Sequence, residues 1–237
     1  MTGKLAGKAA VVMGATSGMG RATALLFARE GARLVLCGRR AGLLQEVGEQ
    51  IAAETGAVTL GLPCDAQDRG QVAGVIQAAR AHFGRIDVFV YATGTNIPRR
   101  ALDELLPETW DEMIGTNLTG AFHCTQLLLP IMREQGDGLI IYLSSIAARR
   151  ADAVSGVAYQ AAKRAIDGIA GTVTAEEKLN GIRASVIYPG FCDTPLVLQR
   201  PSPPLRKCSR KRCCPKTWPR RASSWRHCRP AVTCRSW

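Results

Sequence analysis

The chain has 237 residues, of which 46% are hydrophobic, and it carries a formal net charge of +12. This length is enough for one α/β domain with a substantial buried core. No apolar run reaches the roughly 18 residues that a membrane-spanning helix needs, and residues 1–8 lack the apolar stretch of a signal peptide. These features argue against a membrane protein and predict a cytoplasmic location.

The positive charge is confined to the last part of the chain. Residues 200–237 contain 12 Lys and Arg but no Asp or Glu, so residues 1–199 are balanced at 19 basic and 19 acidic side chains. Three of the four tryptophans and five of the nine cysteines also lie in this tail. We therefore predict one domain over residues 1–199 and a basic, irregular tail over residues 200–237.

Two interpretations of the tail have different consequences. A basic arm with tryptophans would bind nucleic acid, whereas a shifted reading frame would give the same composition without a function. We favour the shifted frame, because GC-rich codons for residues 205–221, read from the third base, can encode an acid-balanced amphipathic helix. Nucleic acid is then not expected as a partner, and without a Cys-x-x-Cys spacing no metal site is expected.

Short apolar runs alternate with segments of helical periodicity along residues 8–189. The remaining cysteines lie among these runs and are expected to be reduced core residues. The predicted strands are 8–14, 33–38, 57–63, 86–92, 139–144 and 182–189, and the predicted helices are 18–31, 41–54, 67–83, a long stretch around 110–133, and 157–180.

This alternation of strands and helices predicts the fold class. Near-continuous apolar strands joined by helices form a parallel sheet that is covered on both faces. Right-handed crossovers then give a three-layer, doubly wound α/β domain of the Rossmann type. Ligands of such sheets bind beyond the carboxyl ends of the strands.

A glycine-rich turn follows the first predicted strand and opens the first predicted helix. Its sequence is Gly14-Ala15-Thr16-Ser17-Gly18-Met19-Gly20. Glycines let the backbone approach a pyrophosphate closely, and a helix N-terminus offers free N–H groups to the phosphates. We interpret the turn as a dinucleotide-binding turn, the alternative being a turn that binds nothing.

The end of the second strand indicates which dinucleotide is preferred. An enzyme that uses NAD places a carboxylate there for the ribose 2′-hydroxyl, whereas this chain has Arg39 and Arg40. Two guanidinium groups suit a 2′-phosphate, and Arg39 is the better candidate. The sequence thus favours NADP(H) over NAD(H), unless both arginines are simply solvated at the start of a helix.

Tyr159 and Lys163 are four positions apart in the sequence, and this spacing places both on one face of the predicted helix. A nearby ammonium is expected to lower the pKa of the phenol and fit it for proton transfer. Ser144 and Ser145 end the fifth strand, where a hydroxyl could stabilise negative charge on a substrate oxygen. Alone, the Tyr/Lys spacing is also that of an ordinary surface pair on a helix.

Together these motifs resemble the short-chain dehydrogenase/reductase family over residues 4–200. The resemblance implies a catalytic group of Asn117, Ser145, Tyr159 and Lys163. It also implies cofactor contacts from Gly14, Thr16, Ser17, Gly18, Met19, Gly20, Arg39, Arg40, Asp65, Gly94, Tyr159, Lys163, Pro189, Gly190 and Thr194. The segment Tyr91-Ala92-Thr93-Gly94 departs from the family's Asn-Asn-Ala-Gly pattern at three positions.

The resemblance implies an oxidoreductase that transfers hydride between NADP(H) and a small carbonyl or alcohol, most readily a 3-oxoacyl compound or a 3-hydroxy acid. It also implies a homodimer or homotetramer. Residues 95–100 and 147–154 are expected near the substrate, and Arg149 and Arg150 are candidates for attracting an acidic one. The alternatives are a non-catalytic NADP(H) sensor and an inactive, truncated member, because relatives continue with a helix and a seventh strand.

Overall fold

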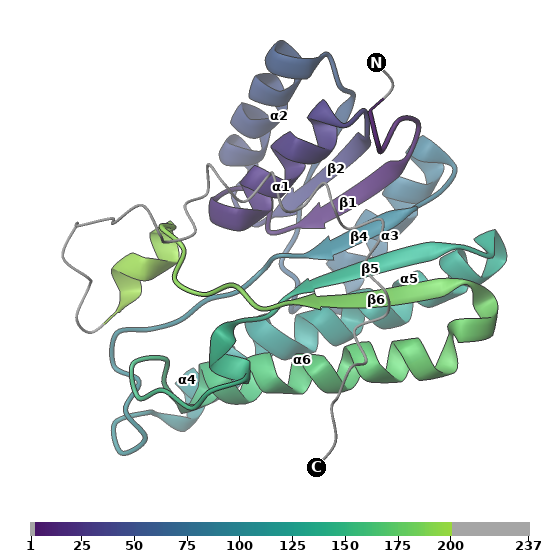
Figure 1. Cartoon of the computed structure of the whole chain (residues 1–237). Helices are drawn as coiled ribbons and strands as arrows, with labels where there is room; N and C mark the ends of the chain where they lie inside the picture. Colours follow the sequence, from purple (N-terminus) through teal and green to yellow (C-terminus); the bar gives the residue numbers. More distant parts are fainter. Residues whose placement is uncertain (1–2, 201–237) are drawn as a thin grey trace.

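Six buried apolar segments form one wholly parallel sheet in the computed structural model, which describes residues 3–200. The tail predicted from residue 200 therefore lies, apart from Arg200, outside the described residues. The strand order is β3-β2-β1-β4-β5-β6 (Figure 1). The strands are β1 (Ala9–Met13), β2 (Arg33–Gly38), β3 (Thr59–Pro63), β4 (Val88–Tyr91), β5 (Gly138–Leu143) and β6 (Ile182–Ile187).

Helices cover both faces of this sheet and complete a three-layer α/β domain (Figure 1). α1 (Gly18–Arg29) and α2 (Ala41–Thr55) pack on one face. α3 (Arg69–Phe83), α5 (Gly120–Gln135) and α6 (Val157–Glu176) pack on the other, with α4 (Pro107–Ile114) beside α6. The predicted doubly wound parallel fold is confirmed.

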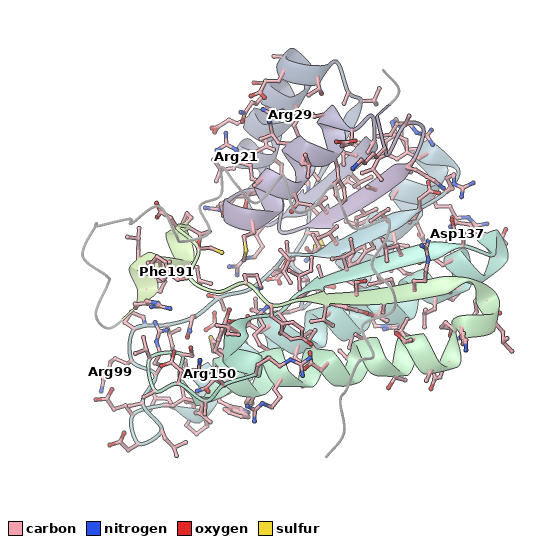
Figure 2. The ribbon with its side chains drawn as sticks, viewed as in Figure 1. Arg21, Arg29, Arg99, Asp137, Arg150 and Phe191 are labelled. Carbon is pink, nitrogen blue, oxygen red and sulfur yellow. The ribbon has the colours of Figure 1, made fainter. Side chains whose placement is uncertain are left out.

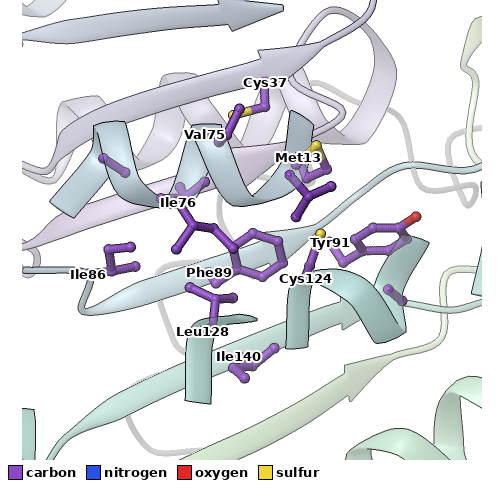
Figure 3. Packing of buried hydrophobic residues seen from close by; sticks show 14 of the residues in the cluster. Met13, Cys37, Val75, Ile76, Ile86, Phe89, Tyr91, Cys124, Leu128 and Ile140 are labelled. Atoms are coloured by element: carbon purple, nitrogen blue, oxygen red, sulfur yellow. The ribbon is translucent and has the colours of Figure 1, made fainter. Parts of the chain in front are cut away.

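On the α3 and α5 side of the sheet, buried apolar side chains form one hydrophobic cluster. Figure 3 shows Phe89 of β4 between Ile76 of α3 and Leu128 of α5. Among the described residues, Cys37, Cys64, Cys124 and Cys192 are buried and form no disulfide. Burial raises the pKa of the Cys64 thiol to about 11, so this thiol stays protonated and unreactive at neutral pH.

The long helix predicted around residues 110–133 is interrupted by a π-helical turn, Gly115–Thr119. In an α-helix the carbonyl of Thr116 would accept a hydrogen bond from the Gly120 N–H. Here the buried Tyr91 hydroxyl donates to that carbonyl at 2.7 Å, and the Gly120 N–H bonds to Gly115 instead. A Cβ on Gly120 would collide with the Tyr91 oxygen. The unusual Tyr91 therefore holds the π-turn open.

No helix within residues 3–200 combines the length and the apolar character that crossing a bilayer requires.

Replacing Tyr91 with Phe should destabilise the domain, because the buried Thr116 carbonyl loses its donor. A buried acceptor left without a partner costs about 1–3 kcal/mol. We expect the Tyr91→Phe free energy of unfolding, measured by urea denaturation, to be lower by that amount. A variant as stable as the wild-type protein would contradict the assigned role of the hydroxyl.

Candidate active site

The glycine-rich turn at the end of β1 depends on each of its three glycines. Gly14 and Gly18 have φ angles of 91° and 53°, which side chains rarely tolerate. A Cβ on Gly14 would lie 2.8 Å from the backbone of Ala92, and one on Gly20 would collide with the Gly14 carbonyl. Only glycine lets β1, α1 and the segment after β4 approach one another this closely.

The first turn of α1 fits the diphosphate of a dinucleotide. Ser17 occupies the N-cap position, but its side chain makes no capping hydrogen bond to the helix. The first N–H groups of a helix have no partner within the helix, and they attract anions together with the helix dipole. The turn and this helix start can therefore hold phosphate groups.

A cavity of about 250 Å³ extends along the carboxyl ends of four strands. It is here called the larger cavity, because it is the larger of the two cavities at the strand ends. It spans the switch point between β1 and β4, which is where such sheets bind nucleotides. Its lining includes the predicted cofactor contacts Gly14, Thr16, Ser17, Gly18, Met19, Arg39, Arg40, Asp65, Gly94 and Thr194.

Two arginines and one carboxylate lie at the β2 and β3 end of the larger cavity. Arg40 donates to the Thr16 hydroxyl at 2.8 Å. The Arg39 Nη1 atom lies 3.9 Å from Asp65 Oδ2, while Asp65 Oδ1 accepts from the Gln67 N–H at 3.0 Å. Both arginine side chains are exposed, so each can turn toward a bound anion at little cost.

Lys163 is buried at the other end of the larger cavity, although it does not line it. Its Nζ donates to the Leu143 carbonyl at the end of β5, at 3.0 Å. Burial lowers the pKa of Lys163 from 10.5 to about 8. A Cβ on Gly94 would lie 3.2 Å from this Nζ and 3.1 Å from Asn117 Oδ1, so Gly94 gives both side chains room.

Asn117 lies in the π-turn and joins it to the segment after β4. Its Oδ1 accepts from the Thr95 N–H at 3.1 Å, and its Nδ2 donates to the Thr95 and Met113 carbonyls. The side chain is completely buried. The Asn117 amide is therefore bonded both to its own helix, through Met113, and to the segment after β4, through Thr95.

The two serines after β5 have different partners. Ser144 is buried and donates to the Lys163 carbonyl at 2.8 Å, which ties α6 to the strand end. Ser145 is partly exposed, lines the same cavity as Tyr159 and is close enough to lower the pKa of its phenol, and it accepts from the Ala147 N–H at 3.2 Å. Ser145, the serine chosen from the sequence, is thus the one beside the phenol.

Burial raises the pKa of the Tyr159 phenol, and the neighbouring Ser145 hydroxyl partly opposes this shift. The net direction is opposite to the lowering by Lys163 that the sequence suggested. The reason is geometric: the Lys163 ammonium bonds to the Leu143 carbonyl and lies 5.8 Å from the centre of the Tyr159 ring. Tyr159 is therefore protonated at neutral pH.

A second cavity, of about 80 Å³ and here called the smaller cavity, adjoins the larger one. Met19, Thr194 and Leu196 line both cavities. The Thr194 side chain does not cap the short helix that follows it. Of the predicted residues, Met19, Ser145, Tyr159, Pro189, Gly190 and Thr194 line the smaller cavity, whereas Gly20, Asn117 and Lys163 line neither.

Sequence reasoning found part of the lining of the smaller cavity and missed the rest. Arg149 and Arg150 do not line it, and Arg149 instead donates to the Tyr188 hydroxyl at 2.6 Å. The predicted segments do contribute, but through Asn96, Arg100 and Val154. No motif or periodicity distinguishes these residues. Also missed were Ser155, Phe191, Cys192, Leu196, Val197 and Arg200.

A doubly wound sheet with a glycine turn, a cavity along the strand ends, and Ser145 and Tyr159 in an adjoining cavity is typical of dinucleotide-binding oxidoreductases. The model of the short chain dehydrogenase family matches residues 8–203. The chain belongs to this family of oxidoreductases, whose members bind nicotinamide cofactors.

Individual relatives agree with this assignment. Uncharacterized oxidoreductases of Staphylococcus epidermidis and Staphylococcus aureus are 33% and 34% identical to it, over 81% and 80% of each chain. A short-chain dehydrogenase/reductase structure from Mycobacterium marinum has a TM-score of 0.78 at 30% identity, covering 81% of this chain and 76% of that one. NAD+-bound xylitol dehydrogenase has a TM-score of 0.77 at 26% identity, covering 80% and 72%.

Replacing Lys163 with Met should stabilise the fold at pH 7. A fall in pKa from 10.5 to about 8 corresponds to a penalty of about 3 kcal/mol for keeping the buried group charged. Loss of the bond to Leu143 offsets about 1 kcal/mol of this. We expect Lys163→Met to raise the free energy of unfolding by about 1–3 kcal/mol.

The pH dependence has a defined sign. Between about pH 8 and 10.5 the folded wild-type protein binds fewer protons than the unfolded chain, so its stability rises with pH. The advantage of Lys163→Met should therefore shrink over this interval in urea denaturation series. A difference that stays constant with pH, or a variant less stable than wild type at pH 7, would contradict the burial cost.

Proposed function

We propose that the protein is an NADP(H)-dependent oxidoreductase that transfers hydride between the nicotinamide and a carbonyl or secondary alcohol, of the 3-oxoacyl or 3-hydroxy acid type. One observation carries the proposal. The cavity lined by Ser145 and Tyr159 adjoins the cavity along the strand ends, and both share Met19, Thr194 and Leu196. A dinucleotide in one cavity would end beside a carbonyl group in the other.

The side chains can divide the chemistry between them. Ser145 and Tyr159 hold the substrate oxygen, and in reduction the Tyr159 O–H bond breaks as its proton passes to that oxygen. The raised pKa of Tyr159 keeps this proton in place until charge develops on the substrate. Lys163, with a pKa of about 8, exchanges protons near neutral pH and restores the proton of the phenol. A water at Asn117 assists it, which is the role that the resemblance to the family implies for this residue. When bound, the nicotinamide supplies or accepts the hydride.

The preference for NADP(H) is supported by charge at the β2 end of the larger cavity. Arg39 and Arg40 line it there, and the nearest acid, Asp65, follows β3 rather than β2. A carboxylate that binds a ribose 2′-hydroxyl would be expected directly after β2. The similar xylitol dehydrogenase structure contains NAD+. The nucleotide preference of the present chain is therefore measured directly, by titration with NADPH and NADH.

Three further proposals follow from the sequence and the family. The buried free cysteines fit a reducing compartment, which supports the cytoplasm. A homodimer or homotetramer is proposed on the family's precedent.

The family match ends at residue 203, close to where the charge balance breaks, which supports a shifted reading frame beyond residue 199. Sequencing the gene tests the frame, and AT-rich codons in an intact frame would end the idea.

Replacing Tyr159 with Phe should reduce kcat/KM for carbonyl reduction by at least about 10²- to 10⁴-fold, because the proton donor is removed. NADPH affinity should stay nearly unchanged, since the phenol contributes little to binding the dinucleotide. Tyr188→Phe is the matched control: this hydroxyl bonds to Asp167 and Arg149 outside both cavities. Turnover by Tyr159→Phe equal to that of the control would refute the assignment, and NADPH binding with no turnover by the wild-type chain would favour the sensor alternative.

The double substitution of Arg39 and Arg40 by Ala should weaken NADPH binding by about 10- to 100-fold and leave NADH binding almost unchanged. The reason is that a charge-assisted hydrogen bond from a guanidinium to a phosphate contributes roughly 1.5–3 kcal/mol, so the expected loss corresponds to about one such bond. Fluorescence titrations with both nucleotides measure the ratio. Arg21→Ala on the exposed face of α1 is the control, because within residues 3–200 the hydrogen bond of its side chain goes to Gln50, away from Arg39 and Arg40 (Figure 2). An equal loss for both nucleotides would contradict the 2′-phosphate role.

A further inference from the structure

The smaller cavity contains a buried arginine without a carboxylate partner. Arg100 is 5% exposed. Its two terminal nitrogens donate to the backbone carbonyls of Val154 and Gln199, at 3.1 Å for Val154. Its buried Nε has no hydrogen-bond partner, and no ion pair of the described residues includes Arg100. A buried guanidinium that keeps its charge normally pairs with an anion.

A second cation lines the same cavity. The Arg200 guanidinium lies 5.1 Å from the centre of the Phe191 ring, over its face, and Phe191 also lines the cavity (Figure 2). The charges of Arg100 and Arg200 repel one another. No Asp or Glu is present among the described residues that line this cavity. The two cations therefore create a positive potential that the surrounding side chains leave unbalanced.

The backbone around Arg100 is shaped to hold it. Gly156, just before α6, has a φ of 76°, and a Cβ there would lie 2.7 Å from the Arg100 Cβ. Any other residue at position 156 would push the arginine away. Asn96 fixes the same neighbourhood by donating to the Ser155 carbonyl at 3.0 Å. Arg100 is thus a positioned group within the wall of the cavity.

We propose that Arg100, assisted by Arg200, binds the carboxylate of a short oxo or hydroxy acid whose reacting carbon lies at Ser145 and Tyr159. This inference rests on the proposed oxidoreductase function and adds the substrate class. The planar guanidinium matches a carboxylate in shape and charge. The volume of the cavity, about 80 Å³, favours a short free acid over a long acyl chain.

The test compares charged and neutral substrates of nearly the same size on the full chain with NADPH. Acetoacetate is paired with acetoacetamide, and 2-oxobutanoate with 2-oxobutanamide. For the pair with the higher turnover, kcat/KM for the acid should exceed that for the amide by about 10- to 100-fold. In Arg100→Gln this ratio should fall toward one, mainly through a higher KM for the acid.

The matched control is Arg99→Gln. Arg99 is adjacent in sequence, exposed, and absent from the lining of the smaller cavity (Figure 2). Its acid-to-amide ratio should equal that of wild type. A structural role of Arg100 alone, in tying Val154 to Gln199, would lower activity on acid and amide in the same proportion and would overturn the proposal.

The proposal stays testable if Arg100→Gln does not fold. Arg200→Gln, at a partly exposed position, should then lower the acid-to-amide ratio at least threefold, and an unchanged ratio overturns the proposal. Failure of this inference is distinct from failure of the proposed function. Reduction of neutral carbonyls with an acid-to-amide ratio near one removes only the carboxylate site, whereas NADPH binding without reduction of any carbonyl removes both.

Discussion

The burial of one ammonium group constrains the whole site. Lys163 lies beneath the carboxyl ends of β4 and β5, where desolvation disfavours its charge and lowers its pKa to about 8. The fold tolerates this because the Leu143 carbonyl accepts its hydrogen bond and Gly94 leaves room beside it. Lys163 is thus a buried ionisable group whose pKa is lowered by desolvation and whose ammonium is held by a backbone carbonyl. Such groups are characteristic of functional sites.

The topology of the sheet explains how distant segments meet around this lysine. Because all six strands are parallel, their carboxyl ends lie at one edge, and the order reverses between β1 and β4. The glycine turn, the two arginines, Asp65 and the serines each follow a different strand. The larger cavity therefore runs past β1 to β4, and the smaller one lies near β5 and β6.

Much of this arrangement could be predicted, because it depends on local chemistry. Apolar runs gave the strands, and the three glycines gave a turn whose steric need for glycine is now explicit. The π-turn could not be predicted, because it depends on a tertiary hydrogen bond between Tyr91 and Thr116, 25 residues apart. The pKa of Tyr159 was also beyond the sequence, since burial and the separate bonding of Lys163 decide its direction. Residues 95–100 were expected near the substrate, but the burial of Arg100 was beyond the sequence, because it depends on the conformation of residues 154–156 and 199.

We propose that one bound dinucleotide would join the glycine turn to Ser145 and Tyr159. A crystal structure of the full chain with NADP+ tests this arrangement. We expect the diphosphate at the first turn of α1, the 2′-phosphate at Arg39 or Arg40, and the nicotinamide end next to Tyr159 and Lys163. A nucleotide bound elsewhere, or a Tyr159 hydroxyl directed away from the nicotinamide, would contradict it.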